Sequence, residues 1–83
     1  MSIAADDVRR LLDAGDADAL LVLIEGQIKI IAPDELDSPA YRGALRVISR
    51  EELISQNGKA DLSDRELAEQ AESLDVVVRN LGG

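Results

Sequence analysis

The amino-acid sequence predicts an α+β fold, in which a small antiparallel sheet is packed by helices from both ends of the chain. Two observations support this fold class. Residues 19–32 read ALLVLIEGQIKIIA, two apolar runs that meet at a glycine, as the strands of a β-hairpin do. The flanking segments 3–14 and 64–81 instead place apolar residues at helical spacings of three and four. A third strand at 44–48 and a short helix at 50–56 complete the expected architecture.

The composition limits both the size of the core and its chemistry. With 83 residues and a formal net charge of −8, residues 1–83 are expected to form a single small acidic domain. The chain contains no Cys, His, Phe or Trp, so its core must be built from Leu, Ile, Val and Ala. Because a domain of this size buries only about 60–65% of its unfolded surface, its margin of stability is thin.

The same composition argues against several classes of partner. A net charge of −8 repels phosphate backbones, and no basic stripe with interleaved aromatics is present, so we expect no nucleic-acid binding. The longest apolar run covers only residues 19–24, whereas a membrane-spanning helix needs about 20 residues. Asp6 and Asp7 precede the first Arg and no apolar region follows, unlike a signal peptide. Together with the lack of Cys, this predicts a cytoplasmic protein.

The first helix is expected over residues 3–14. Val8, Leu11 and Leu12 fall on one face. Asp6 lies in the early turns, where a carboxylate interacts favourably with the helix dipole. Gly15 follows the last periodic residue and is the expected C-terminal cap.

The hairpin over 19–32 leaves two points open. Its turn is either Glu25-Gly26 or Gly26-Gln27, because glycine accepts the positive φ that a tight turn needs. A competing interpretation makes Asp16 the N-cap of a helix that runs to Glu25 and stops at Gly26. The β-branched character of the segment favours strands over this helix; the residues concerned are Val22, Ile24, Ile28, Ile30 and Ile31.

Residues 33–43, PDELDSPAYRG, form the longest polar segment and the leading candidate for a recognition loop. Pro33 ends the second strand, and Ser38-Pro39 is typical of the start of a short helix. Tyr41 and Arg42 are candidate partner-binding residues, because both residue types are enriched at binding hot spots. The alternative is structural: the tyrosine ring packs at the edge of the core, and the arginine pairs with a nearby acid.

The strand at 44–48, ALRVI, competes with a helix that continues from Pro39 through the same residues. The next four residues decide between them. Ser49 and Glu52 form a capping box, in which each side chain accepts a hydrogen bond from the other residue's backbone N–H. A helix over 50–56 that begins there implies that a different element ended before it. Asn57-Gly58 closes this helix.

The last helix is expected over 64–81, after a second capping box made by Ser63 and Glu66. Leu67, Leu74 and Leu81 recur every seven residues along it. Packing against the protein's own sheet is the default for such a stripe. The more specific alternative is that the stripe forms a homodimer seam, an interface with the same helix of a second copy. This makes the three leucines candidate partner-binding residues.

The end of the chain also resembles a known family. Residues 72–83, ESLDVVVRNLGG, are similar to the ends of ubiquitin-like and sulfur-carrier proteins. The resemblance implies a final strand instead of a helix over 72–81, and a terminal Gly82-Gly83 that becomes adenylated or conjugated. Three successive valines at 76–78 are poor helix formers and fit that strand. The early hairpin and a short helix after Ser38 also fit the element order of such proteins.

The function expected from the sequence is non-catalytic. Without His or Cys, and without convergent carboxylates or a phosphate-binding glycine loop, we predict no enzyme activity and no cofactor. Segments that imitate parts of an EF-hand lack its ligands, so no metal site is expected. The leading hypothesis is a module for protein interaction or self-association, with a protein or a second copy as partner. The alternatives are a carrier that uses its C-terminal Gly-Gly, and an acidic partner or inhibitor of a basic protein.

Overall fold

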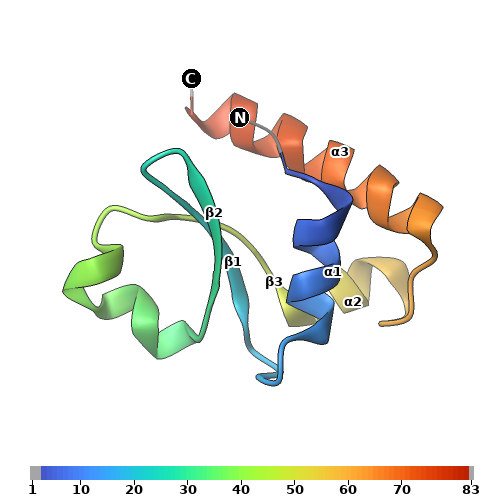
Figure 1. The fold of residues 1–83 in the computed structure, drawn as a ribbon, viewed down its shortest axis with the longest axis horizontal. Helices are drawn as coiled ribbons and strands as arrows, with labels where there is room; N and C mark the ends of the chain where they lie inside the picture. Colours follow the sequence, from blue (N-terminus) through green and yellow to red (C-terminus); the bar gives the residue numbers. More distant parts are fainter. Residues whose placement is uncertain (1–2, 83) are drawn as a thin grey trace.

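The computed structural model describes residues 3–82 and confirms the α+β fold (Figure 1). Three antiparallel strands form one sheet, which three α-helices and two 3₁₀ turns accompany. In chain order the elements are α1 (Ala5–Asp13), β1 (Leu20–Ile24), β2 (Gln27–Ile31), η1 (Pro33–Asp37), η2 (Pro39–Tyr41), β3 (Leu45–Ser49), α2 (Arg50–Asn57) and α3 (Asp64–Gly82).

The hairpin forms as predicted, and its turn is Glu25-Gly26. Both turn residues have positive φ, +50° at Glu25 and +76° at Gly26, as a tight hairpin turn with right-handed strand twist requires. The strands pair from Leu20 with Ile31 to Ile24 with Gln27. The competing helix through residues 16–25 is therefore wrong, because β-branched side chains pack better on a pleated strand.

The strand order is β2-β1-β3, so β1 lies in the centre of the sheet. The third strand is confirmed, one residue later than expected, and the competing helix through 44–48 is wrong. Its pairing with β1 is irregular: Leu21 lies opposite Ile48, but Val22 lies opposite Arg46. This bulge places one extra residue, Val47, in β3 and bends the strand just before α2 begins.

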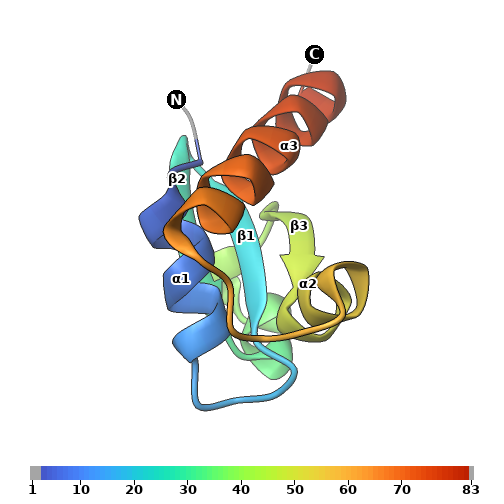
Figure 2. The same cartoon turned by 90° about the vertical axis from the view of Figure 1, so that its right-hand side faces the viewer.

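Both faces of the sheet are covered, which explains why β1 is apolar at every position (Figures 1 and 2). Leu21 and Ile48 face the main core, which also contains the buried residues of α1 and α3. Leu20, Val22 and Ile31 point to the opposite face. There the 3₁₀ turns cover them, and the side chains that pack on them are Leu36, Tyr41 and Ala44.

Helices α1 and α3 lie side by side over the sheet (Figure 2). Polar contacts join the two ends of the chain at this layer: the backbone N–H of Ile3 donates to Asp75 Oδ1 (3.0 Å), and Arg9 forms an ion pair with Asp64 (2.6 Å). The α1 helix ends earlier than predicted. Its C-cap is Ala14 with φ −59°, so the expected cap at Gly15 is wrong.

The last segment is helical to Gly82, so the strand that the ubiquitin-like resemblance implied over 72–81 is not formed. The capping box at the start of α3 is present: Ser63 N–H donates to Glu66 Oε1 (2.9 Å), and Glu66 N–H donates to Ser63 Oγ (3.2 Å). A helix nucleated there and packed on α1 outweighs the weak helix propensity of three valines. Gly83 lies outside the described residues.

Candidate functional site

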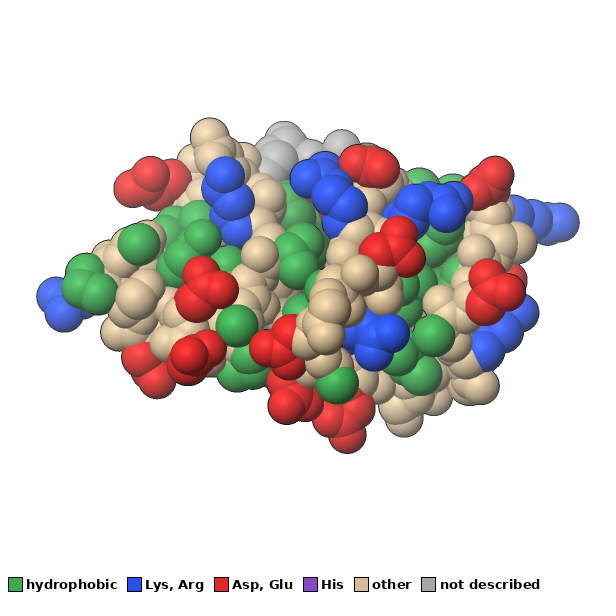
Figure 3. All heavy atoms as spheres, turned by 60° about the horizontal axis from the view of Figure 1, so that its bottom comes forward, with side chains coloured by type: hydrophobic (Ala, Val, Ile, Leu, Met, Phe, Trp, Pro, Cys, Tyr) green, Lys and Arg blue, Asp and Glu red, His purple; other side chains and the backbone are tan. Residues whose placement is uncertain are grey.

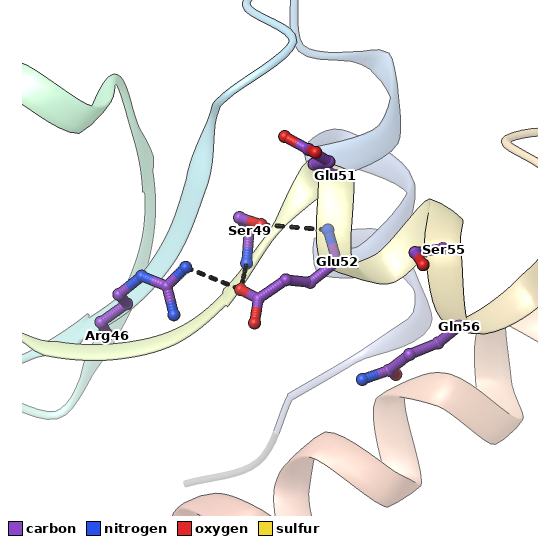
Figure 4. A pocket seen from close by; sticks show the side chains of 6 residues that line it. All are labelled: Arg46, Ser49, Glu51, Glu52, Ser55 and Gln56. Atoms are coloured by element: carbon purple, nitrogen blue, oxygen red, sulfur yellow. Dashed lines mark hydrogen bonds and ion pairs between the residues drawn. The ribbon is translucent and has the colours of Figure 1, made fainter.

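A hollow of about 540 Å³ opens where β3 runs into α2 (Figure 4). This position follows from the local sequence, because the capping box turns the chain sharply from strand to helix at Ser49. Polar and charged side chains from both elements line the hollow: Arg46, Ser49, Glu51, Glu52, Ser55 and Gln56.

The capping box fixes one wall of this hollow (Figure 4). Ser49 N–H donates to Glu52 Oε1 and Glu52 N–H donates to Ser49 Oγ, both at 3.0 Å. The guanidinium of Arg46 reaches across from β3 and donates to the same Glu52 Oε1 at 2.7 Å. The Ser49 N–H, and after it Arg46, hold the pKa of Glu52 below its usual value of 4.5. Glu52 is therefore a fixed anion at neutral pH.

A second hollow of about 360 Å³ adjoins the first and shares three of its residues, Arg46, Ser49 and Glu51. It extends toward η1 and the turn before β1, and its further lining residues are Asp18, Leu20, Pro33 and Leu36. The two hollows together are called the junction groove below. Segments from four places in the sequence therefore meet in it: the turn before β1, η1, the end of β3 and the start of α2.

The junction groove combines an apolar part with a negative rim. Pro33 and Leu36 supply the apolar surface; Leu20 also borders the groove but is only 5% exposed. Three carboxylates and one guanidinium line the groove, so its net charge is −2. The guanidinium of Arg46 is already bound to Glu52, which leaves Asp18 and Glu51 to meet a ligand. Figure 3 shows acidic side chains along the lower end of the molecule, with hydrophobic atoms between them.

Such an arrangement suits the side chains of Lys and Arg. Each has an alkyl stem that packs on apolar surface and a cationic head that binds carboxylates. The available groups are carboxylates and hydroxyls, and within residues 3–82 no three Asp or Glu residues lie close enough together to hold a metal ion. The chemistry of the groove is thus complementary to a cationic side chain with an apolar stem.

Tyr41 and Arg42, the predicted recognition residues, do not line the junction groove. Tyr41 is half-buried and packs against Leu20, Val22 and Ile31, so the structural alternative for its ring is confirmed. Arg42 is exposed beside it. A partner contact at this pair stays a prediction.

Leu67 and Leu74 are not available to a partner, which corrects the predicted dimer seam. Their exposed fractions are 3% and 6%, because this stripe of α3 packs against α1 inside the protein's own core. The seven-residue spacing of the leucines identified an apolar face, and the single chain itself covers that face. The side chain of Leu81, the third residue of the predicted seam, lies outside the described residues.

The structure reveals site residues that the sequence did not single out. Asp18, Leu36 and Arg46 meet at the junction groove only after the chain has folded, so no local motif marks them. Val76 and Val77 on α3 are each 43% exposed, although valines are commonly buried. The run of three valines favoured a strand in this segment. The sequence therefore did not indicate that Val76 and Val77 lie on the exposed side of a helix.

Comparisons with known proteins supply no further identification: no family model matches the chain, and no curated protein or solved structure matches it significantly. Among the described residues, none of the helices has the length and apolar character needed to cross a membrane.

Proposed function

We propose that this domain is a non-catalytic protein-interaction module that binds a basic segment of a partner protein in the junction groove. The observation that carries the proposal is the combination in one concave surface of apolar side chains, Pro33 and Leu36, with the carboxylates of Asp18 and Glu51. Each feature alone is common on protein surfaces. Together they match the two-part chemistry of Lys and Arg side chains.

The charge of the whole chain supports the same type of partner. A net charge of −8 attracts a basic segment from a distance and speeds its encounter with the domain. It also disfavours acidic partners and nucleic acids. In the complex, the alkyl stem of a partner's Lys or Arg lies on Pro33 and Leu36, and its cation meets Asp18 or Glu51.

The chemistry of the groove favours binding over catalysis. A general acid or base works best when its pKa lies near the working pH. The pKa of Glu52 is shifted in the opposite direction, downward, by Ser49 and Arg46. Its Oε1 atom is also occupied by these two hydrogen bonds, so the carboxylate serves the structure of the groove.

The test measures the binding of a short basic peptide by fluorescence anisotropy. The probe is a labelled pentapeptide, KLKRL, and its acidic counterpart ELEDL is the control ligand. We expect KLKRL to bind and ELEDL not to bind. Glu51→Lys should weaken KLKRL binding about tenfold, because it replaces an attractive carboxylate by a repulsive cation inside the groove.

The matched control is Glu25→Lys, which makes the same change in net charge at the exposed turn of the hairpin, outside the groove. It should weaken binding less than about threefold, through the long-range field alone. Equal effects of the two substitutions would overturn the proposal, since they would mean that the peptide senses only total charge. So would failure of KLKRL to bind the wild-type domain.

A further inference from the structure

We infer that the outward face of α3 is a self-association surface, on which the α3 helix of a second copy packs in antiparallel orientation. This inference is independent of the junction groove, because it concerns another surface and another partner. It also replaces the leucine seam predicted from the sequence, since it uses the opposite side of the same helix.

The outward face of α3 lies opposite the buried stripe. Leu67, Leu74 and Val78 point into the core, and at 100° per residue Val76 falls on nearly the opposite side of the helix. Val76 and its neighbour Val77 are the large hydrophobic residues that stand exposed in the described part of the chain, at 43% each. The most outward large apolar side chain of α3 is therefore exposed to solvent.

A shallow hollow on this face is lined in part by Val76. Its lining residues are Glu69, Glu72, Ser73 and Val76. These residues are spaced i, i+3, i+4 and i+7, which is the set of four side chains that forms a hole in knobs-into-holes packing between helices. A valine has a suitable size to enter such a hole. When Val76 of a second copy enters it, two-fold symmetry makes the reciprocal contact automatically.

The charges of α3 select the antiparallel orientation. With Val76 of each copy in the hole of the other, Arg79 of one copy lies beside Glu69 and Glu72 of the other. Glu72 and Arg79 are exposed, so these contacts need no rearrangement of the core. They exchange with two ion pairs within α3, Arg79 with Asp75 (3.8 Å) and Arg65 with Glu69 (3.4 Å). A parallel pair would instead place Glu72 against Glu72 and Arg79 against Arg79. Unlike charges thus meet in one orientation, and like charges meet in the other.

The expected dimer is weak and becomes tighter at high salt. One exposed helix face is a small interface, and small interfaces are typical of transient complexes. We expect a dissociation constant on the order of 100 µM at moderate ionic strength. Each copy carries a net charge of −8, and salt screens the repulsion between copies. The exposed cross-helix ion pairs contribute less to the free energy of dimerisation than this repulsion does, so added salt favours the dimer overall.

Sedimentation equilibrium from 10 µM to 1 mM protein, at about 0.05 and 0.5 M NaCl, tests the inference (concentration ranges set by the expected affinity). The wild-type chain should form dimers, and more of them at the higher salt concentration. Val76→Glu should raise the dissociation constant at least about tenfold, since it buries a charge in the partner's hole. Ala17→Glu adds the same charge at an exposed turn position away from α3. It should change the dissociation constant of the dimer less than about threefold.

The orientation has its own test by charge reversal. Arg79→Glu should weaken the dimer, whereas Arg42→Glu, which makes the same charge change at an exposed site outside α3, should weaken it less. Adding Glu72→Arg to Arg79→Glu returns the net charge to −8 and should restore the dimer, because the cross-helix pair is then inverted. Far-ultraviolet circular dichroism establishes that each variant is folded.

A wild-type chain that stays monomeric to 1 mM at both salt concentrations would overturn the inference, whatever the outcome of peptide binding at the junction groove. Dimers that persist unchanged in Val76→Glu would place the self-association surface elsewhere. Failure of the double reversal to restore the dimer would exclude the antiparallel arrangement. Peptide binding is measured at protein concentrations far below the dissociation constant of the dimer, where the domain is monomeric. Failure of one proposal is therefore distinguishable from failure of the other.

Discussion

At the scale of single residues, Ser49 and Glu52 join β3 to α2. Their reciprocal hydrogen bonds begin α2, and Glu52 also fixes Arg46 on β3. Ser49 is 8% exposed, so few water molecules are available to replace these bonds. The same two residues form a wall of the junction groove, and its shape therefore depends on the capping box.

Replacement of the capping serine should lower stability without preventing folding. We expect Ser49→Ala to reduce the free energy of unfolding by about 1 kcal/mol, because the backbone N–H of Glu52 loses its acceptor, Ser49 Oγ. Ser55→Ala on the exposed face of α2 is the control and should change stability by less than about 0.5 kcal/mol. Urea unfolding followed by circular dichroism measures both variants. Equal losses in the free energy of unfolding would show that the Ser49 side chain does not stabilise the start of α2.

The acid stability of the domain should depend on Glu52 and Glu66. The pKa of each is lowered from 4.5, first by the backbone N–H of Ser49 or Ser63 and then by Arg46 or Lys59. A carboxylate with a lowered folded-state pKa stabilises the fold above its unfolded pKa, and this contribution is lost as the pH falls through the folded pKa.

The measurement compares wild type with Glu52→Gln between pH 7 and pH 3. The wild type should be the more stable protein at pH 7, and the difference in free energy of unfolding should shrink as the pH falls below 4.5. A difference that stays constant over this range would show that the carboxylate is not the group responsible.

At the scale of elements, α3 has two faces with different roles. Its inner face, with Leu67 and Leu74, completes the core against α1. Its outer face presents Val76 beside the four-residue hole. The sequence pattern revealed that the helix is amphipathic, but it did not reveal which partner covers the apolar stripe.

Truncation of one residue from each face distinguishes these roles. Leu74→Ala should lower the free energy of unfolding by about 2–4 kcal/mol, because it leaves a cavity in the core. Val76→Ala should change the stability of the monomer by less than about 0.5 kcal/mol. Thermal unfolding at 10 µM protein compares them. A small loss for Leu74→Ala would contradict the packing of this leucine inside the protein's own core.

The elements that the sequence predicted correctly are those with a local physical signal. The hairpin was marked by two β-branched runs and a glycine, and the start of α2 by the Ser49–Glu52 box. The position of each strand in the sheet has no such signal, because pairing of β1 with β3 joins residues more than twenty positions apart. The covering of the second face by residues 33–41 is likewise a long-range contact.

The candidate site was less predictable than the fold for the same reason. Residues of the junction groove come from four segments, and none of these segments contains a sequence motif that indicates a binding site. Tyr41 and Arg42 were chosen by residue type, and residue type does not say that a tyrosine ring packs on the protein's own sheet. Only the folded arrangement brings Asp18, Leu36 and Glu51 to one surface.

At the scale of the whole molecule, the net charge of −8 acts on the two proposed surfaces in opposite ways. Salt weakens the attraction between the junction groove and a basic peptide, but it also weakens the repulsion between two copies that meet at α3. Rising salt should therefore release the peptide and favour the dimer. Parallel responses of the two equilibria would mean that one of the surfaces is wrongly assigned.

An amide chemical-shift titration of the ¹⁵N-labelled domain with the basic peptide KLKRL tests directly whether the peptide binds in the junction groove. The groove residues Asp18, Leu20, Ser49 and Glu51 should show the largest shifts, and α3 should be little affected. Shifts spread over all acidic positions, or concentrated outside the junction groove, would contradict the assignment of this groove as the binding surface.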